Sequence, residues 1–305
     1  MSLPKSKKLS HDMPRWTGKS RGTALGYKIV LLVCTRLGIS SAYFLLRFVS
    51  FYFFLFSWKS SKYSYQYFRY QHGFIPFKAL GKVYRNYYLF SQTLLDKIIV
   101  LAGVKNDFTY NYDGEENLHK IVQGGRGGIL LSAHVGNWEV AGHLLDRLGT
   151  RVNVVIYDGE GQHIKEFLAR MMGRRNLNII VIKNDISHVY AIGEALQKNE
   201  LVCLHADRFL DDNKTVVKKF LQGKAKFPVG PFALAATFRV PVSLVFAFKE
   251  NINQYHFFGS GCVQREETES KSDFTTRLMN SFVVQLEDKI RLYPEQWFNY
   301  YKFWE

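Results

Sequence analysis

The sequence contains few cysteines and prolines, and this scarcity excludes several classes of protein. Only three cysteines occur in 305 residues, Cys34, Cys203 and Cys262, and no two of them have CxxC spacing. Distant cysteines in an odd number supply neither a disulfide framework nor a cysteine zinc site, and they indicate a reducing compartment. With seven prolines and 47% hydrophobic residues, most of the chain is not intrinsically disordered. Its length suits one large or two ordinary domains.

Acidic residues are also scarce: 26 Asp and Glu stand against 41 Lys and Arg, a net charge of +15. Such an excess indicates an acidic partner, which could be nucleic acid, anionic lipid or an acidic protein. Nine histidines show no HExxH spacing, so no metal is expected. The chain has no GxSxG elbow, and the glycine-rich segment 124–128 precedes a strand, which predicts a turn and not a phosphate loop. No cofactor and no nucleic-acid partner are expected.

The N-terminal region lacks a long uncharged apolar run. Residues 1–24 form a basic arm, and the apolar stretch that follows, within 25–60, is interrupted by Lys28, Arg36 and Arg47. A membrane span needs about 20 mostly apolar residues, and residues 37–57 would place Arg47 near its middle. We therefore expect a helix that lies in, or dips into, the cytoplasmic face of a membrane; a buried core helix is the alternative.

The rest of the chain, 61–305, predicts an α/β domain. Residues 60–120 have a helical pattern, whereas later segments are short continuous apolar runs typical of buried parallel strands. The expected strands are 128–133, 152–156, 178–182, 201–204 and 240–248, and the expected helices are 137–148, 162–172, 188–198, 230–238 and 272–293. This alternation predicts a mostly parallel central sheet flanked by helices, with an N-terminal apolar helix that associates with the membrane.

A candidate catalytic turn follows the first expected strand. His134 leaves the strand end, Gly136 permits a sharp turn, and Asn137 is a suitable N-cap for the next helix. With His134 on the loop and Glu139 in the first helical turn, the carboxylate could orient the imidazole while the ring takes a proton from a hydroxyl. A histidine that only bonds a loop carbonyl is the alternative.

Three segments carry a family resemblance. The hexapeptide HVGNWE at 134–139 resembles the H-x4-D/E motif of the lysophospholipid acyltransferase superfamily, in the form found in its lipid A late acyltransferase branch. The ending at 293–304, with its PEQWF run, and the Gly and Pro turn within 220–231 are similar to that branch as well. The resemblance covers about 25–304. It implies transfer of a fatty acyl group from acyl carrier protein to a hydroxyl of a membrane-embedded acceptor, at the cytoplasmic face of the bacterial inner membrane.

The resemblance also implies donors for the oxyanion of the thioester. Backbone amides around Gly136 and Asn137 are candidates, together with a basic side chain from the region after the second strand. Family members carry an arginine there. In this chain Arg170 is the nearest match, followed by Arg174 and Arg175.

Acidic residues near the expected strand ends bear on the acceptor. By resemblance, Asp207 supports the site or contacts the acceptor; alternatively, it pairs with Arg208 or caps a turn. Many lipid A enzymes have a tyrosine-arginine-proline segment after the second strand, where this chain has Asp158 and Glu160. These acids weaken the case for a phosphorylated acceptor, but a lipid A precursor still ranks narrowly ahead of amino-acid lipids, glycolipids or lipid-like pigments.

Another basic segment lies late in the chain, where four lysines flank Phe220. It could dock the acidic acyl carrier protein or anionic lipid, or form a plain solvated face. Its lysines are Lys218, Lys219, Lys224 and Lys226. A non-catalytic, basic membrane-binding protein is the alternative to an enzyme, and the intact motif at 134–139 argues against it.

Overall fold

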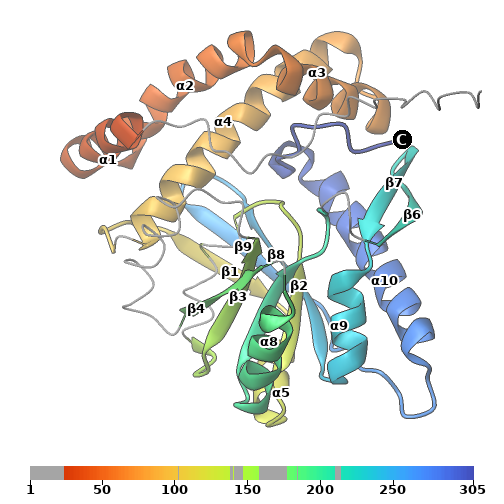
Figure 1. Ribbon diagram of the computed structural model, residues 1–305. Coiled ribbons are helices and arrows are strands. Elements are labelled where there is room, and N and C mark those ends of the chain that lie inside the picture. The colour runs from red at the N-terminus through yellow and green to blue at the C-terminus, as the bar shows by residue number, and fades with distance from the viewer. Residues whose placement is uncertain are drawn as a thin grey trace, which may run out of the picture.

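The structure is a computed structural model that describes residues 24–101, 103–137, 140, 147–157, 177–183, 185–209 and 214–305. Its centre is a seven-stranded sheet in the order β1-β9-β8-β2-β5-β3-β4 (Figure 1). The strands are β1 (Thr109–Asp113), β2 (Gly128–Ser132), β3 (Val152–Tyr157), β4 (Leu177–Ile182), β5 (Leu201–His205), β8 (Val242–Lys249) and β9 (Gln254–Gly259).

Five neighbouring strands, β8, β2, β5, β3 and β4, run parallel, which confirms the expected sheet. They are the five apolar runs that the sequence indicated. β9 is antiparallel to β8, and β1 is parallel to β9. The helical prediction for 60–120 is therefore wrong at Thr109–Asp113. Here Tyr110 and Tyr112 stack on Phe257, and this pairing with a distant strand overrides the local pattern.

Helices cover the two faces of the sheet and bury different residues. On one face, α8 (Ser187–Gln197), α9 (Gly230–Phe238) and α10 (Lys271–Leu292) confirm the helices expected at 188–198, 230–238 and 272–293. On the other face, α5 (Glu115–Gln123) packs beside Leu130 and Phe257. The helices expected at 137–148 and 162–172 fall almost entirely on residues outside the described part of the chain.

The basic segment near Phe220 forms a β-hairpin. β6 (Thr215–Phe220) pairs antiparallel with β7 (Gly223–Pro228). Phe220 and Phe227 are fully buried, and the indole of Trp304 donates a hydrogen bond to the Phe220 carbonyl. The C-terminal aromatic segment therefore anchors the hairpin, and Figure 1 shows the C-terminus beside β7.

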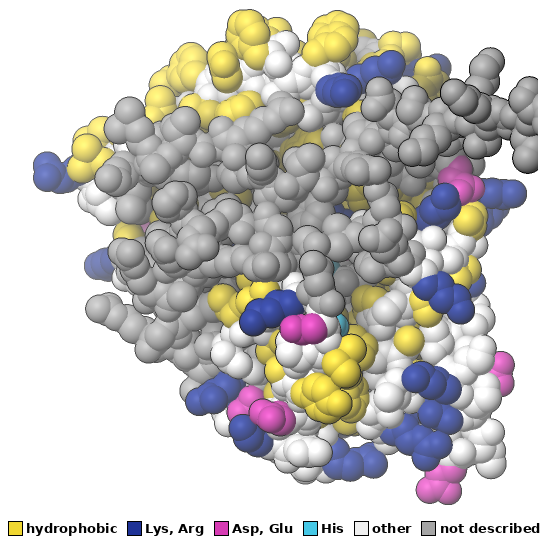
Figure 2. Space-filling model, viewed as in Figure 1, with side chains coloured by type: hydrophobic (Ala, Val, Ile, Leu, Met, Phe, Trp, Pro, Cys, Tyr) yellow, Lys and Arg dark blue, Asp and Glu magenta, His cyan; other side chains and the backbone are white. Residues whose placement is uncertain are grey.

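The N-terminal helices pack along one end of the sheet (Figure 1). They are α1 (Ala24–Leu37), α2 (Ile39–Phe56), α3 (Trp58–Gln66), a π-helical segment η1 (Tyr67–Gln71) and α4 (Pro76–Leu101). Within the described residues, α2 is the one helix whose length and composition would allow it to cross a membrane, and only 22% of it is buried. Ala42, Tyr43 and Leu46 of α2 are buried, whereas Phe44 and Phe48 are exposed. Figure 2 shows hydrophobic side chains gathered along the upper edge, where α2 lies.

A buried polar cluster joins α2 and α4 to the sheet. The Asp96 carboxylate of α4 accepts hydrogen bonds from Tyr43 at 2.5 Å, from Lys249 Nζ at 2.6 Å, and from Tyr255. Burial raises the pKa of Asp96 and lowers the pKa of Lys249, while their mutual attraction opposes both changes. Asn137 Nδ2 also donates to Tyr255 Oη at 3.2 Å. The cluster therefore connects the N-terminal helices to the turn that carries His134.

Candidate active site

The pairing of β2 with β5 brings two distant polar residues together. These parallel strands are aligned so that Ser132 lies opposite His205, and the Ala206 amide extends the ladder by donating to the Ser132 carbonyl. Two residues further along each strand, His134 and Asp207 meet beyond the C-terminal ends. Ligands of open α/β sheets bind at this edge.

The His134 imidazole is held by the Asp207 carboxylate. Nδ1 of His134 lies 2.8 Å from Oδ1 of Asp207, and the His134 amide donates to Oδ2 at 3.1 Å. The Asp207 side chain is 1% exposed and that of His134 is 29% exposed. Burial acts to raise the pKa of Asp207, but His134 and Arg208 outweigh it and hold that pKa below its usual value. Since the carboxylate is ionised, it accepts a hydrogen bond from Nδ1, and this contact favours the tautomer in which Nε2 is the acceptor.

A second imidazole lies beside the first. The ring centroids of His134 and His205 are 4.3 Å apart. Burial, followed by the neighbouring His134, lowers the pKa of His205 well below its usual value. His205 is therefore neutral near pH 7. A positive charge that forms on His134 during proton transfer would not meet a second charged imidazole.

The turn after His134 requires a glycine. Gly136 has a φ of +59°, and a Cβ there would lie 1.8 Å from the Ala247 carbonyl oxygen. Its amide donates to the Gln296 carbonyl at 2.8 Å, and the Asn137 amide donates to Ala247 at 2.8 Å. Both amides therefore have protein acceptors. The expectation that they wait for an oxyanion is corrected.

The side chain of Asn137, which was expected to bind substrate, instead contacts other parts of the protein. Its side chain is fully buried, and its amide group donates to the Thr93 carbonyl at 3.2 Å and to Tyr255 Oη. These contacts attach the turn to α4 and β9. In the described structure, the Asn137 side chain positions the turn.

Four other residues expected at the site are not part of the described structure. Glu139, Arg170, Arg174 and Arg175 lie outside the described residues, as do Asp158 and Glu160. Their proposed roles remain predictions. Among the residues that are described, no group of three His, Cys, Asp or Glu side chains is arranged to hold a metal.

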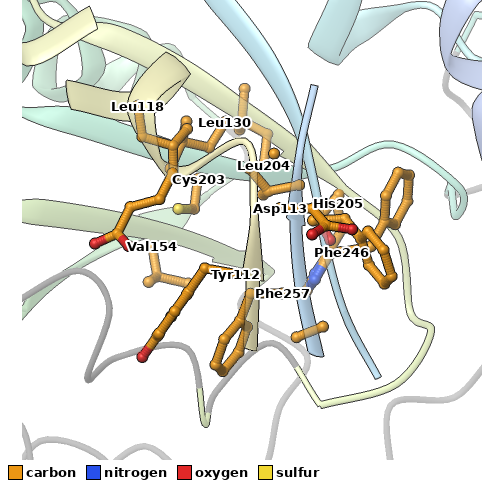
Figure 3. A pocket seen from close by; sticks show the side chains of 16 residues that line it. Tyr112, Asp113, Leu118, Leu130, Val154, Cys203, Leu204, His205, Phe246 and Phe257 are labelled. Atoms are coloured by element: carbon orange, nitrogen blue, oxygen red, sulfur yellow. The ribbon is translucent and has the colours of Figure 1, made fainter. Parts of the chain in front are cut away.

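An apolar pocket on the α5 side of the sheet is lined in part by His205, the neighbour of His134 (Figure 3). His205 and Ser132 lie in its lining, Leu130, Cys203 and Val154 supply apolar surface, and Asp113 lies near Phe246 in the view. The Ser132 hydroxyl is buried and has no hydrogen-bond partner among the described residues. It can therefore donate to a carbonyl group bound in this pocket.

His134 and Asp207 were predicted from the sequence, but their direct contact was not, and no role was predicted for His205 or Ser132. The signal for the contact is the strand register. Once β2 and β5 are neighbours with Ser132 opposite His205, the positions 134 and 207 must be adjacent. Strand order is a nonlocal property, so the apolar runs alone could not supply it.

A comparison with family profiles agrees with the motif. The family profile described as bacterial lipid A biosynthesis acyltransferase matches residues 97–305, which is more than half of the chain. No curated protein matches. Among solved structures, the chain is similar to the 1-acyl-sn-glycerophosphate acyltransferase PlsC from Thermotoga maritima, with 13% identity over 82% of this chain and 97% of that chain, at a TM-score of 0.38.

Proposed function

The chain belongs to the bacterial lipid A biosynthesis acyltransferase family, and from this membership we propose that it transfers a fatty acyl group from acyl carrier protein to a hydroxyl of a lipid A precursor. The enzyme is an acyltransferase; the donor, the acceptor and the location at the cytoplasmic face of the inner membrane are the proposal. The observation that carries it is the His134–Asp207 pair at the HVGNWE turn.

The pair supplies general-base catalysis. The acceptor hydroxyl gives its proton to Nε2 of His134 as its oxygen attacks the thioester carbonyl, and Asp207 stabilises the imidazolium that results. The tetrahedral intermediate then collapses. The C–S bond breaks, and the imidazolium returns the proton to the departing sulfur. We assign the unpartnered Ser132 hydroxyl as one donor to the carbonyl oxygen, and a cationic side chain such as Arg170 as another.

The apolar pocket offers a place for the acyl chain. It begins at His205, whose ring lies beside the proposed base, and continues along β2 and β5 between aliphatic and aromatic side chains. Burying a methylene group there contributes about 0.8 kcal/mol. This pocket favours an acyl donor over a small polar one.

Two lysines of the β6–β7 hairpin are arranged to attract an acidic donor protein. Lys218 bonds Asn280 and Lys226 pairs with Glu305, whereas Lys219 and Lys224 are exposed and directly opposite each other across the hairpin. Like charges opposite each other destabilise a hairpin, so this pair is unfavourable for folding alone. We propose that it docks acyl carrier protein.

Charge reversal tests this docking. Lys219→Glu with Lys224→Glu should raise the KM for acyl carrier protein and weaken its salt dependence, because charge across a protein contact acts mainly on encounter. The matched control reverses Lys120 and Arg126, which lie on and just after α5. If the control raises KM equally, the hairpin has no special role.

The exposed face of α2 supports membrane association. Phe44 and Phe48 are exposed, while Tyr43 of the same helix bonds Asp96 of α4. Because this bond attaches α2 to the body, we propose that α2 lies along the membrane surface. Deleting residues 1–58 should release protein from membranes into the soluble fraction. Full-length protein that stays soluble without detergent at physiological salt would contradict this.

The substrates are tested with purified enzyme and acyl carrier protein that bears a labelled acyl group. We expect label to appear in a lipid A precursor, and mass spectrometry of cell lipids should show one acyl chain fewer when the protein is removed. Label that enters an amino-acid lipid or glycolipid instead would overturn the acceptor. Equal transfer from acyl coenzyme A would overturn the donor.

A further inference from the structure

A cationic groove lies on the first half of α4, away from the catalytic pair. It is lined by Lys78, Gly81, Lys82 and Arg85 of α4 and by Glu295 of the short helix η3 (Pro294–Gln296). Residues four and seven positions apart on a helix share one face, so the three cations point to the same side. None of its residues takes part in the bond-making and proton-transfer steps proposed above.

The charges in the groove are not balanced. Glu295 contacts Lys82 Nζ, and its Oε1 lies 3.6 Å from Arg85 Nε. Within the described residues, no carboxylate lies within 4.0 Å of Lys78. One carboxylate therefore faces three cations, and the like charges repel one another. An anion in the groove would relieve this repulsion.

Gly81 keeps the groove open. It lies inside a long helix, where glycine is less favourable than alanine by about 0.5–1 kcal/mol. A Cβ at this position would meet no atom within 4 Å. Neither packing nor backbone conformation requires glycine here, whereas a larger side chain would project into the space beside Lys78, Lys82 and Arg85.

The groove lies between an apolar surface and the catalytic turn. Beside it on α4, Phe77 is 85% exposed and Leu80 is also exposed. On its other side, Asn86 Nδ2 donates to the carbonyls of Glu295 and Trp297, and the Gly136 amide donates to the carbonyl of Gln296. A lipid with its chains at the apolar surface could thus place its headgroup in the groove, which is bonded to the turn of His134 through residues 295–297.

We propose that this groove binds a phosphomonoester in the headgroup of the acceptor lipid. The two excess positive charges match such a group, which carries about −1.5 to −2 at pH 7. Arg85 can bind phosphate oxygens with two parallel hydrogen bonds, and Lys78 and Lys82 act as point charges. The inference rests on the proposed function, since it assigns the groove to the acceptor of the same reaction.

The test uses short-chain phosphatidic acid as the probe. It is titrated by calorimetry into full-length protein in neutral detergent, and short-chain phosphatidylglycerol serves as the phosphodiester comparison. Two variants alter the groove differently: Arg85→Gln removes a charge, and Gly81→Gln fills the space with a better helix former without changing charge. Lys59→Gln, an exposed lysine on α3, is the matched control for charge.

We expect phosphatidic acid to bind more tightly than phosphatidylglycerol, and Arg85→Gln to weaken it about tenfold or more, the effect of losing a charged hydrogen bond. Gly81→Gln should also weaken it, because the new side chain occupies the groove. Lys59→Gln should have little effect. If the groove variants lost affinity equally for both lipids, or if Lys59→Gln lost as much affinity as Arg85→Gln, the attraction would be general and the proposal would be overturned. Unaltered affinity in Gly81→Gln would overturn it as well. His134→Ala should retain binding, so the groove and the proposed reaction can fail independently.

Discussion

Replacing Asp207 by asparagine separates the charge behind His134 from its shape. Asparagine keeps the size of the side chain and one oxygen acceptor, but it removes the charge that stabilises an imidazolium. Its amide can also donate to Nδ1, which would place the ring proton on Nε2 and remove the base. The geometry that makes this substitution informative is the 2.8 Å contact between His134 Nδ1 and Asp207 Oδ1.

Two magnitudes follow from this geometry. Transfer should slow by about 10²- to 10⁴-fold, the usual contribution of a positioned general base. The protein should also lose about 1.5–3 kcal/mol of stability, the value of a hydrogen bond to a charged group, because Asp207 is buried. Since the pKa of Asp207 is lowered in the folded state, this loss is complete at neutral pH and shrinks as the pH falls below about 4.

The assay is single-turnover transfer, with circular dichroism as the control for folding. Because Asp207 acts through His134, the double variant His134→Ala with Asp207→Asn should be no slower than His134→Ala alone. A folded Asp207→Asn enzyme with a rate near that of the parent would refute the reasoning. If Glu139→Gln slowed transfer and Asp207→Asn did not, Glu139 would be the carboxylate that orients His134, as the sequence first indicated.

Two further predictions concern the turn and its support. Gly136→Ala should cost about 1–3 kcal/mol from its positive φ alone, and more from the contact with the Ala247 carbonyl, so thermal unfolding should show a lower Tm; an unchanged Tm would contradict the turn geometry. Lys249→Met should lose about 3–5 kcal/mol because it leaves the buried Asp96 carboxyl without its cation, and Asp96→Leu in the same chain should recover most of it in urea unfolding; no recovery would mean that packing, not charge, holds the cluster.

An element of this fold can be predicted from the sequence when its signal is local. The runs at β2 and β8 are continuously apolar because both faces of a central parallel strand are buried, and this alone indicates their type. β1 gave no such signal. Its residues alternate between exposed and half-buried positions at the sheet edge, and its partner β9 lies far along the chain.

The same distinction applies to the site. His134 was indicated by a motif contained in six residues, whereas its contact with Asp207 depends on which strands are neighbours. The buried cluster of Tyr43, Asp96, Lys249 and Tyr255 was not predicted at all, because it joins two helices to the sheet over long separations. Charged and hydroxyl side chains in apolar segments can only be recognised as a cluster after the helices are placed.

The central claim is that His134 is the base of an acyl-transfer reaction, and single-turnover transfer by the His134→Ala variant tests it most directly. Parent and variant are each mixed with the acceptor lipid and with acyl carrier protein that bears a labelled acyl group. The enzyme concentration exceeds that of this donor, and folding is checked by circular dichroism. The account predicts a folded variant in which transfer falls by about 10²- to 10⁴-fold. A folded His134→Ala enzyme that transfers at nearly the rate of the parent would contradict it.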